Sequence, residues 1–202
     1  MIGIIDYKAG NAPSVLSAVS HLGHRAELVS RLEELSDKTH IILPGVGSAG
    51  ATMKSLCDLG FTHALRQIVL TEKRLFLGVC VGMQILFEHS EEEDADCLGF
   101  LPGEVKSFNR GKVRVPQMGW NEVRFKKSTA CTARDDYFYF VNSYFAVPKN
   151  EEDIWGVAEY DGPFTAAVNR DNIYGTQFHI EKSGEAGLKL LNSFLAAEGG
   201  GR

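Results

Sequence analysis

One cysteine of this chain lies in a setting that suits a nucleophile. Cys80 stands between Gly78 and Gly82, where the apolar run LFLGV passes into a segment with helical spacing. This is the pattern of a nucleophile elbow, a strand-to-helix turn so sharp that only small residues fit two positions either side. The start of a helix also favours the thiolate, which is the attacking form. The pattern predicts a nucleophile at Cys80, although the spacing alone fits a structural cysteine in a buried strand equally well.

A cysteine nucleophile needs a base, and the base needs a group that orients it. His179 ends the strand-like segment IYGTQFH, and Glu181 follows two residues later. Residues two apart in extended backbone project to the same side, so Glu181 can hold one imidazole nitrogen while the other faces Cys80. The other histidines and cysteines lack such partners, and we interpret them as surface or packing residues.

A glycine-rich turn, PGVGS, follows the predicted strand HIIL. Such turns expose backbone N–H groups toward an anion, although a glycine turn on its own is usually just a tight connection. Here a doubly wound fold brings the turn beside the elbow. We therefore expect backbone N–H groups near Val46 and at Val81 to form an oxyanion hole.

These residues need elements that position them, and the chain alternates between two kinds of element. Short apolar runs such as IGIIDY, RAELV and HIILPG alternate with helical patterns, among them one over residues 49–72. This alternation indicates a mostly parallel sheet flanked by helices, with ligands at the carboxyl ends of the strands. From about Pro102 onward, strands joined by turns predict an antiparallel or mixed sheet, closed by a last helix at LKLLNSFLAA. We expect one α/β domain over residues 1–202.

Composition excludes several classes of function. The net charge of -5 provides no basic surface for nucleic acid, and no apolar stretch is long enough to span a membrane. The four cysteines form no CxxC pair, which argues against a zinc site and against a disulfide framework. Cysteines without a disulfide framework favour a location in the reducing cytoplasm. We expect neither a metal nor a cofactor. The acidic run EEEDAD, residues 91–96, is interpreted as a solvated loop.

Several spaced segments together resemble a known family. PGVG, GVCVGMQ and QFHIEKSG resemble the class I, triad-type glutamine amidotransferases, which have a flavodoxin-like fold. IGIIDYKAGN, VPQMGWNEV and YFVNSYF extend the resemblance to glutaminase subunits of imidazole glycerol phosphate synthase, over nearly the whole chain. The resemblance implies that Cys80, His179 and Glu181 hydrolyse L-glutamine to glutamate and ammonia. It also implies a heterodimer with a (β/α)₈ cyclase subunit, which uses the ammonia to make imidazole glycerol phosphate and AICAR from PRFAR in histidine biosynthesis.

The resemblance also assigns residues to the substrate and to the partner. The positions that match glutamine-binding positions are Gly45, Gly47, Gln84, Ser143 and Tyr144. The positions that match the partner-facing segments are Gln117, Met118, Trp120, Asn121 and Lys182. Met118 and Trp120 lie on a predicted turn, where either burial in a partner or packing in the core explains their apolar side chains.

Three residues depart from the family pattern. Gln117 and Asn142 stand where histidine is usual, and they keep hydrogen-bonding capacity without a titratable ring. Ile180 replaces a proline, which frees its φ angle and predicts a less rigid spacing between His179 and Glu181. These departures bear on the identity of the partner more than on glutamine hydrolysis.

Three alternatives therefore stay open. The first is a paralogous glutaminase subunit that supplies ammonia to another synthase, such as one that amidinates a surface sugar. The second is a binding-only regulatory subunit. The third is a cysteine peptidase of similar architecture. A peptidase would use the same elbow and a histidine, but it would not explain why the PGVG turn and the His-x-Glu pair occur together.

Overall fold

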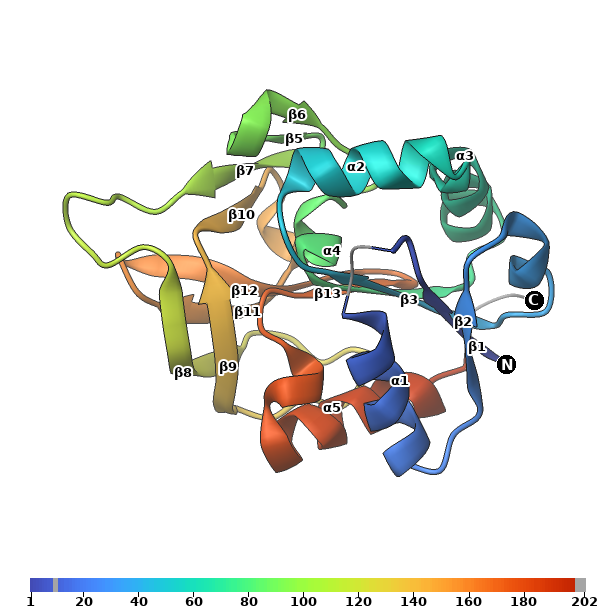
Figure 1. The fold of residues 1–202 in the computed structure, drawn as a ribbon. Coiled ribbons are helices and arrows are strands. Elements are labelled where there is room, and N and C mark those ends of the chain that lie inside the picture. The colour runs from blue at the N-terminus through green and yellow to red at the C-terminus, as the bar shows by residue number, and fades with distance from the viewer. Residues whose placement is uncertain (9–10, 199–202) are drawn as a thin grey trace.

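The structure, a computed structural model, describes residues 1–8 and 11–198. Its centre is a parallel sheet built from the apolar runs that the sequence predicts as strands (Figure 1). β1, β4 and β13 are buried along their whole length because helices cover both faces of the sheet. The predicted α/β, flavodoxin-like fold is thereby confirmed. The strand order is β2 (Ala26–Val29), β1 (Ile2–Ile5), β3 (His40–Gly45), β4 (Leu75–Cys80) and β13 (Ile173–Thr176).

Helices lie on both faces of this sheet (Figure 1). One face carries α1 (Ala12–His21) and α5 (Gly184–Ala196), and the other carries α2 (Ala49–Asp58), α3 (Phe61–Arg66) and the short α4 (Val81–Gln84). The prediction of one continuous helix over residues 49–72 is wrong. Gly60 separates α2 from α3 with a φ of +77°, which a residue without a Cβ adopts readily. Within the described residues, no helix has the length and apolar character needed to cross a membrane.

The second half of the chain adds antiparallel strands beyond β13, as predicted. β12 (Pro163–Arg170) pairs with β13, and β10 (Tyr144–Pro148), β7 (Gly103–Ser107), β5 (His89–Ser90) and β6 (Ala95–Asp96) extend the sheet. A hairpin of β8 (Gln117–Phe125) and β9 (Asp136–Asn142) is joined to β12 through β11 (Ile154–Glu159). Short 3₁₀ turns occupy Leu32–Leu35, Glu92–Asp94, Glu151–Asp153 and Ile180–Lys182.

Aromatic packing fixes the hairpin against the central sheet. Phe138 and Phe140 of β9 contact Phe178, with ring centroids 4.1 and 5.6 Å apart. Phe178 follows β13 and is fully buried. Its burial orients the two polar residues that flank it, Gln177 and His179, because neighbouring side chains in extended backbone point to opposite sides.

Candidate active site

Cys80 occupies the sharp turn that the glycine spacing predicts. It is the last residue of β4 and directly precedes α4, with φ +56° and ψ -113°, a strained combination for a residue that is not glycine. A Cβ on Gly78 would lie 2.4 Å from the Gly82 carbonyl oxygen, and one on Gly82 would lie 2.0 Å from that of Leu43. Only glycine fits at these two positions, and the elbow depends on both.

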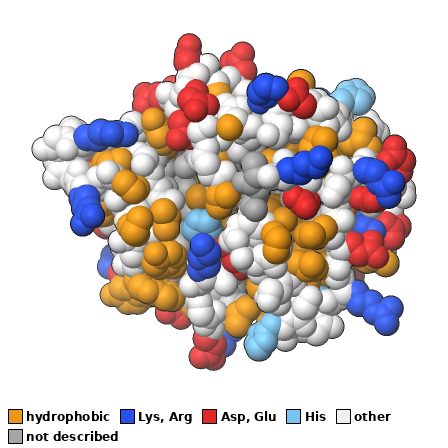
Figure 2. Space-filling view, in the orientation of Figure 1, with side chains coloured by type: hydrophobic (Ala, Val, Ile, Leu, Met, Phe, Trp, Pro, Cys, Tyr) orange, Lys and Arg blue, Asp and Glu red, His pale blue; other side chains and the backbone are white. Residues whose placement is uncertain are grey.

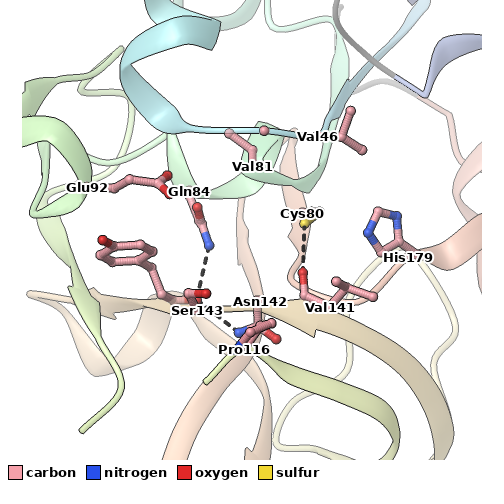
Figure 3. A pocket seen from close by; sticks show the side chains of 12 residues that line it. Val46, Cys80, Val81, Gln84, Glu92, Pro116, Val141, Asn142, Ser143 and His179 are labelled. Atoms are coloured by element: carbon pink, nitrogen blue, oxygen red, sulfur yellow. Dashed lines mark hydrogen bonds between the residues drawn. The ribbon is translucent and has the colours of Figure 1, made fainter. Parts of the chain in front are cut away.

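His179 and Glu181 form a buried pair, and the ring of His179 lies beside Cys80 (Figure 3). Nδ1 of His179 lies 2.9 Å from Oε1 of Glu181, and the two side chains are 5% and 1% exposed. Burial opposes protonation of the ring, but hydrogen bonding and charge at Cys80 and Glu181 outweigh it and raise the pKa of His179 to about 9. The ring is therefore held as an imidazolium, close to the sulfur, at neutral pH.

Asn11 is a fourth member of this group that sequence reasoning missed. Its Nδ2 donates to Oε1 of Glu181 at 2.5 Å, so this oxygen accepts from both Asn11 and His179. Asn11 precedes α1 and is 170 positions away from Glu181. No local pattern relates the two residues, since the sheet brings them together.

Hydrogen bonds on both sides of Ile180 hold the backbone between His179 and Ser183. The N–H of His179 donates to the Tyr139 carbonyl at 2.9 Å, and the carbonyl of His179 accepts from Ser183 Oγ at 2.7 Å. Ser183 Oγ in turn accepts from the N–H of Tyr139 at 3.0 Å. Ile180 itself is buried in the core. These contacts support the spacing of His179 and Glu181, while the expected effect of Ile180 on its rigidity stays a prediction.

A cavity of about 250 Å³ opens at the sulfur of Cys80 (Figure 3). It brings most of the predicted catalytic and substrate-binding positions together in one place. Gly45 does not line the cavity. A Cβ on Gly45 would lie 2.4 Å from the Gly82 nitrogen, so the absence of a side chain at Gly45 allows the close backbone approach that the elbow requires. The lining residues are Val46, Gly47, Cys80, Val81, Gln84, Glu92, Pro116, Val141, Asn142, Ser143, Tyr144 and His179.

With this geometry established, comparisons with known proteins decide the family. A family model described as "Glutamine amidotransferase class-I" matches residues 3–197. The chain belongs to the class-I glutamine amidotransferases. A relative from Leptospira interrogans, "Imidazole glycerol phosphate synthase subunit HisH", is 43% identical and covers 97% of this chain and 100% of its own. A protein of the same name from Maridesulfovibrio salexigens is 43% identical, with 96% and 95% covered.

Solved structures agree on the fold of this amidotransferase. "Crystal structure of glutamine amidotransferase" superposes with a TM-score of 0.78 at 18% identity, and "Structure of PurLQS from Thermotoga maritima" with 0.78 at 19% identity. Each alignment covers 96% of both chains. At this level of identity the likeness concerns the fold alone.

The glycine-rich turn of this amidotransferase lies over the nucleophile, between β3 and α2. Val46 is partly exposed at the cavity, and Gly47 has a φ of +97°. Tyr7 is buried beneath the turn; burial raises the pKa of its hydroxyl, against the opposing effects of Thr52 and the Val46 backbone. Val46 and Val81 therefore line the cavity close to Cys80, where an oxyanion hole is expected.

Glu92 is a second cavity residue that sequence reasoning missed. Its Oε2 accepts from the N–H of Ala49 at 2.8 Å, at the start of α2, and burial raises the pKa of its carboxyl. The neighbouring Glu93 accepts from Ser48 Oγ at 2.9 Å. The interpretation of the acidic run as a solvated loop is therefore wrong for Glu92, because the amino end of α2 attracts the carboxylates inward.

The hairpin β8–β9 carries the exposed apolar surface of this amidotransferase. Met118, Trp120 and Tyr137 are 66%, 57% and 57% exposed, and Figure 2 shows hydrophobic side chains gathered over this hairpin. Met118 and Trp120 are thus surface residues and not part of the core. Lys182 is exposed as well, and Asn121 is half-buried and donates to the Glu159 carbonyl at 2.8 Å.

Gln117 and Asn142, where the resemblance leads one to expect histidine, face each other behind this surface. Gln117 and Asn142 are paired across β8 and β9, and they are 4% and 5% exposed. Gln117, which is predicted to face a partner, is buried in this chain, because side chains alternate along a strand and its neighbour Met118 takes the outward position. Asn142 lines the cavity instead and donates to the Tyr144 carbonyl at 2.9 Å.

No group of three or more His, Cys, Asp or Glu side chains in residues 1–8 and 11–198 is arranged to hold a metal ion.

Proposed function

We propose that this chain is the glutaminase subunit of an imidazole glycerol phosphate synthase. It hydrolyses L-glutamine to glutamate and ammonia and supplies the ammonia to a cyclase subunit. The observation that carries the proposal is Cys80 on a strained elbow, beside the buried pair of His179 and Glu181 and open to a cavity. The relatives called subunits of this synthase support it, because each aligns with this chain over nearly its full length.

In the first half of the reaction, the thiolate of Cys80 attacks the carbon of the glutamine side-chain amide. The N–H groups of Val81 and of the turn at Val46 stabilise the oxyanion that forms. His179 gives its proton to the leaving nitrogen, the C–N bond breaks, and ammonia departs. A glutamyl thioester remains on the sulfur.

In the second half, the now neutral His179 takes a proton from water, and the hydroxide attacks the thioester. The C–S bond breaks, its electron pair returns to the sulfur, and glutamate leaves. Glu181 stabilises the imidazolium that this step restores, and Asn11 holds the carboxylate in place. The second half-reaction thus restores the thiolate of Cys80 and the imidazolium of His179 that the resting site has.

Two cavity residues fit the amino-acid end of glutamine. Glu92 provides a carboxylate for the α-ammonium group, and a charge-assisted hydrogen bond of this type contributes about 1.5–3 kcal/mol. Gln84 uses its Nε2 to donate to the Tyr144 carbonyl and to Gln177 Oε1, each at 3.0 Å. Its own Oε1 is therefore the group left for an N–H of the substrate, while Ser143 and Tyr144 form the opposite wall.

The exposed hairpin suits the docking of a partner. Met118, Trp120 and Tyr137 combine large apolar side chains with high exposure, which is typical of the central residues of an interface. Lys182 lies next to the catalytic pair, so the same face reaches the active site. We propose that the (β/α)₈ cyclase subunit binds here, in a cytoplasmic heterodimer, and converts PRFAR and ammonia to imidazole glycerol phosphate and AICAR.

Glutamate release from glutamine tests this function. We expect release by the chain mixed with the cyclase subunit and PRFAR, and its loss in Cys80→Ala. Undiminished turnover by Cys80→Ala refutes Cys80 as the nucleophile.

A second candidate, a subunit that supplies a different synthase, is favoured by Gln117 and Asn142 in place of histidine. Binding to the cyclase of the same organism, measured by calorimetry, separates the two. Failure to bind it, with glutaminase chemistry intact, selects the second candidate.

A further inference from the structure

We propose that Gln177 is a further catalytic residue, whose side-chain N–H stabilises the thiolate of Cys80. The proposal rests on the proposed function in one respect, namely that Cys80 is the nucleophile. It concerns a residue that neither the glycine spacing nor the His-x-Glu pair brings to attention.

Gln177 lies directly beside the nucleophile. β13 runs parallel to β4 with Thr176 opposite Val79, so the next residue on each strand is Gln177 and Cys80. The backbone N–H of Gln177 donates to the Ala166 carbonyl at 2.8 Å, and the side chain is fully buried. Nε2 of Gln177 lies 3.8 Å from Sγ of Cys80, within reach of an N–H···S hydrogen bond.

A chain of hydrogen bonds fixes which end of the Gln177 amide faces the sulfur. The chain begins at the Tyr144 backbone carbonyl, which can only accept. Gln84 must therefore present its NH₂ group to this carbonyl at 3.0 Å, and the same nitrogen donates to Oε1 of Gln177, also at 3.0 Å. With Oε1 occupied as an acceptor, the NH₂ group of Gln177 is the end that points at Sγ. A reversed amide would place two donors against each other at Gln84.

The direction of this amide matters because the site must hold a charged sulfur away from water. The Val141 carbonyl lies 3.9 Å from Sγ and, as an acceptor, can favour only the neutral thiol. The N–H of Gln177 favours the thiolate, and burial makes such a donor more valuable. Unlike the imidazolium of His179, the amide does not lose its proton during the reaction. It therefore remains available when the C–S bond breaks and the electron pair returns to the sulfur.

The test is the pH dependence of Cys80 alkylation by iodoacetamide, in the full chain, followed by mass spectrometry of the peptide that contains Cys80. Gln177→Met removes the donor at similar volume. Gln177→Glu keeps the acceptor for Gln84 and replaces the donor by a carboxylate oxygen. We expect the midpoint of the alkylation profile to move up by about one pH unit in both variants. In the complex with the cyclase, kcat should fall about tenfold while KM changes less than about twofold.

Thr176→Val is the matched control, because Thr176 is the adjacent residue of β13 and is equally buried but bonds only the Phe178 carbonyl, at 3.1 Å. A structural effect moves the unfolding temperature and leaves the alkylation midpoint unchanged. Wild-type midpoints in both folded Gln177 variants, or in one if the other does not fold, overturn the proposal. A shifted midpoint in a chain that releases no glutamate leaves Gln177 in its role and refutes the glutaminase function instead.

Discussion

Replacing Gly82 by alanine tests the elbow most directly. The added Cβ would lie 2.0 Å from the Leu43 carbonyl oxygen, whereas Cβ atoms in proteins essentially never come closer than 3.0 Å to such a neighbour. The backbone of β3 or α4 must therefore move by roughly 1 Å. Both are buried, β3 within the central sheet and α4 against it, so we expect a loss of about 3 kcal/mol in the free energy of unfolding, at the upper end of the range for overpacking. Because α4 carries Val81 and follows Cys80, a displacement of this size should lower turnover on the order of a hundredfold.

Urea unfolding and glutaminase turnover in the presence of the cyclase measure the two effects. Gly111→Ala is the control, because Gly111 is exposed and the nearest atom to its added Cβ is a side-chain oxygen at 3.2 Å. It should stay within about 0.5 kcal/mol of wild type. A Gly82→Ala variant with wild-type stability and turnover would show that the elbow does not depend on the close approach of β3 and α4.

Three further predictions follow from the site and the exposed hairpin. Glu92→Gln should raise KM for glutamine about tenfold or more with kcat changed less than threefold, and a fall in kcat at constant KM contradicts its contact with the substrate. The pKa of His179 is raised from 6.5 to about 9, so protonation of its ring stabilises the fold fully below pH 6.5. This contribution, at most about 3 kcal/mol, is lost as pH rises through 9. NMR titration of the ring and unfolding measured at pH 6.5 and pH 9 check this prediction, and a titration midpoint near 6.5 refutes it. Trp120→Ala should weaken cyclase binding at least about thirtyfold by calorimetry, whereas Leu32→Ala, exposed at the far edge of the sheet, should leave binding unchanged.

The elbow and the catalytic pair could be predicted because their geometry is local. Gly78 and Gly82 are needed within two residues of Cys80. His179 and Glu181 are only two residues apart, although a 3₁₀ turn over Ile180–Lys182, and not the extended backbone that the sequence predicts, brings their side chains together. The parallel core was equally accessible, since strands buried on both faces read as continuous apolar runs. In each case a few neighbouring residues contain the whole pattern.

Sequence reasoning fails at positions whose surroundings are set by residues far away in the chain. Glu92 has the composition of a solvated loop, but the start of α2, 43 positions earlier, draws its carboxylate inward. Asn11 reaches Glu181 only through the packing of α1 against the Ile180–Lys182 turn. Gln117 is predicted at the interface together with its neighbours, but its side chain is buried because alternation along a strand sends adjacent side chains to opposite faces.

The loop that carries His179 also protects a strand edge. β9 pairs with β8 on one side only among the described strands, and Ser183 and His179 occupy the N–H and carbonyl of Tyr139 on the other. A bare edge of this kind is a template for pairing with a second molecule. Solubility and catalysis therefore depend on the same loop, and Ser183→Ala should make the chain prone to self-association as well as slower.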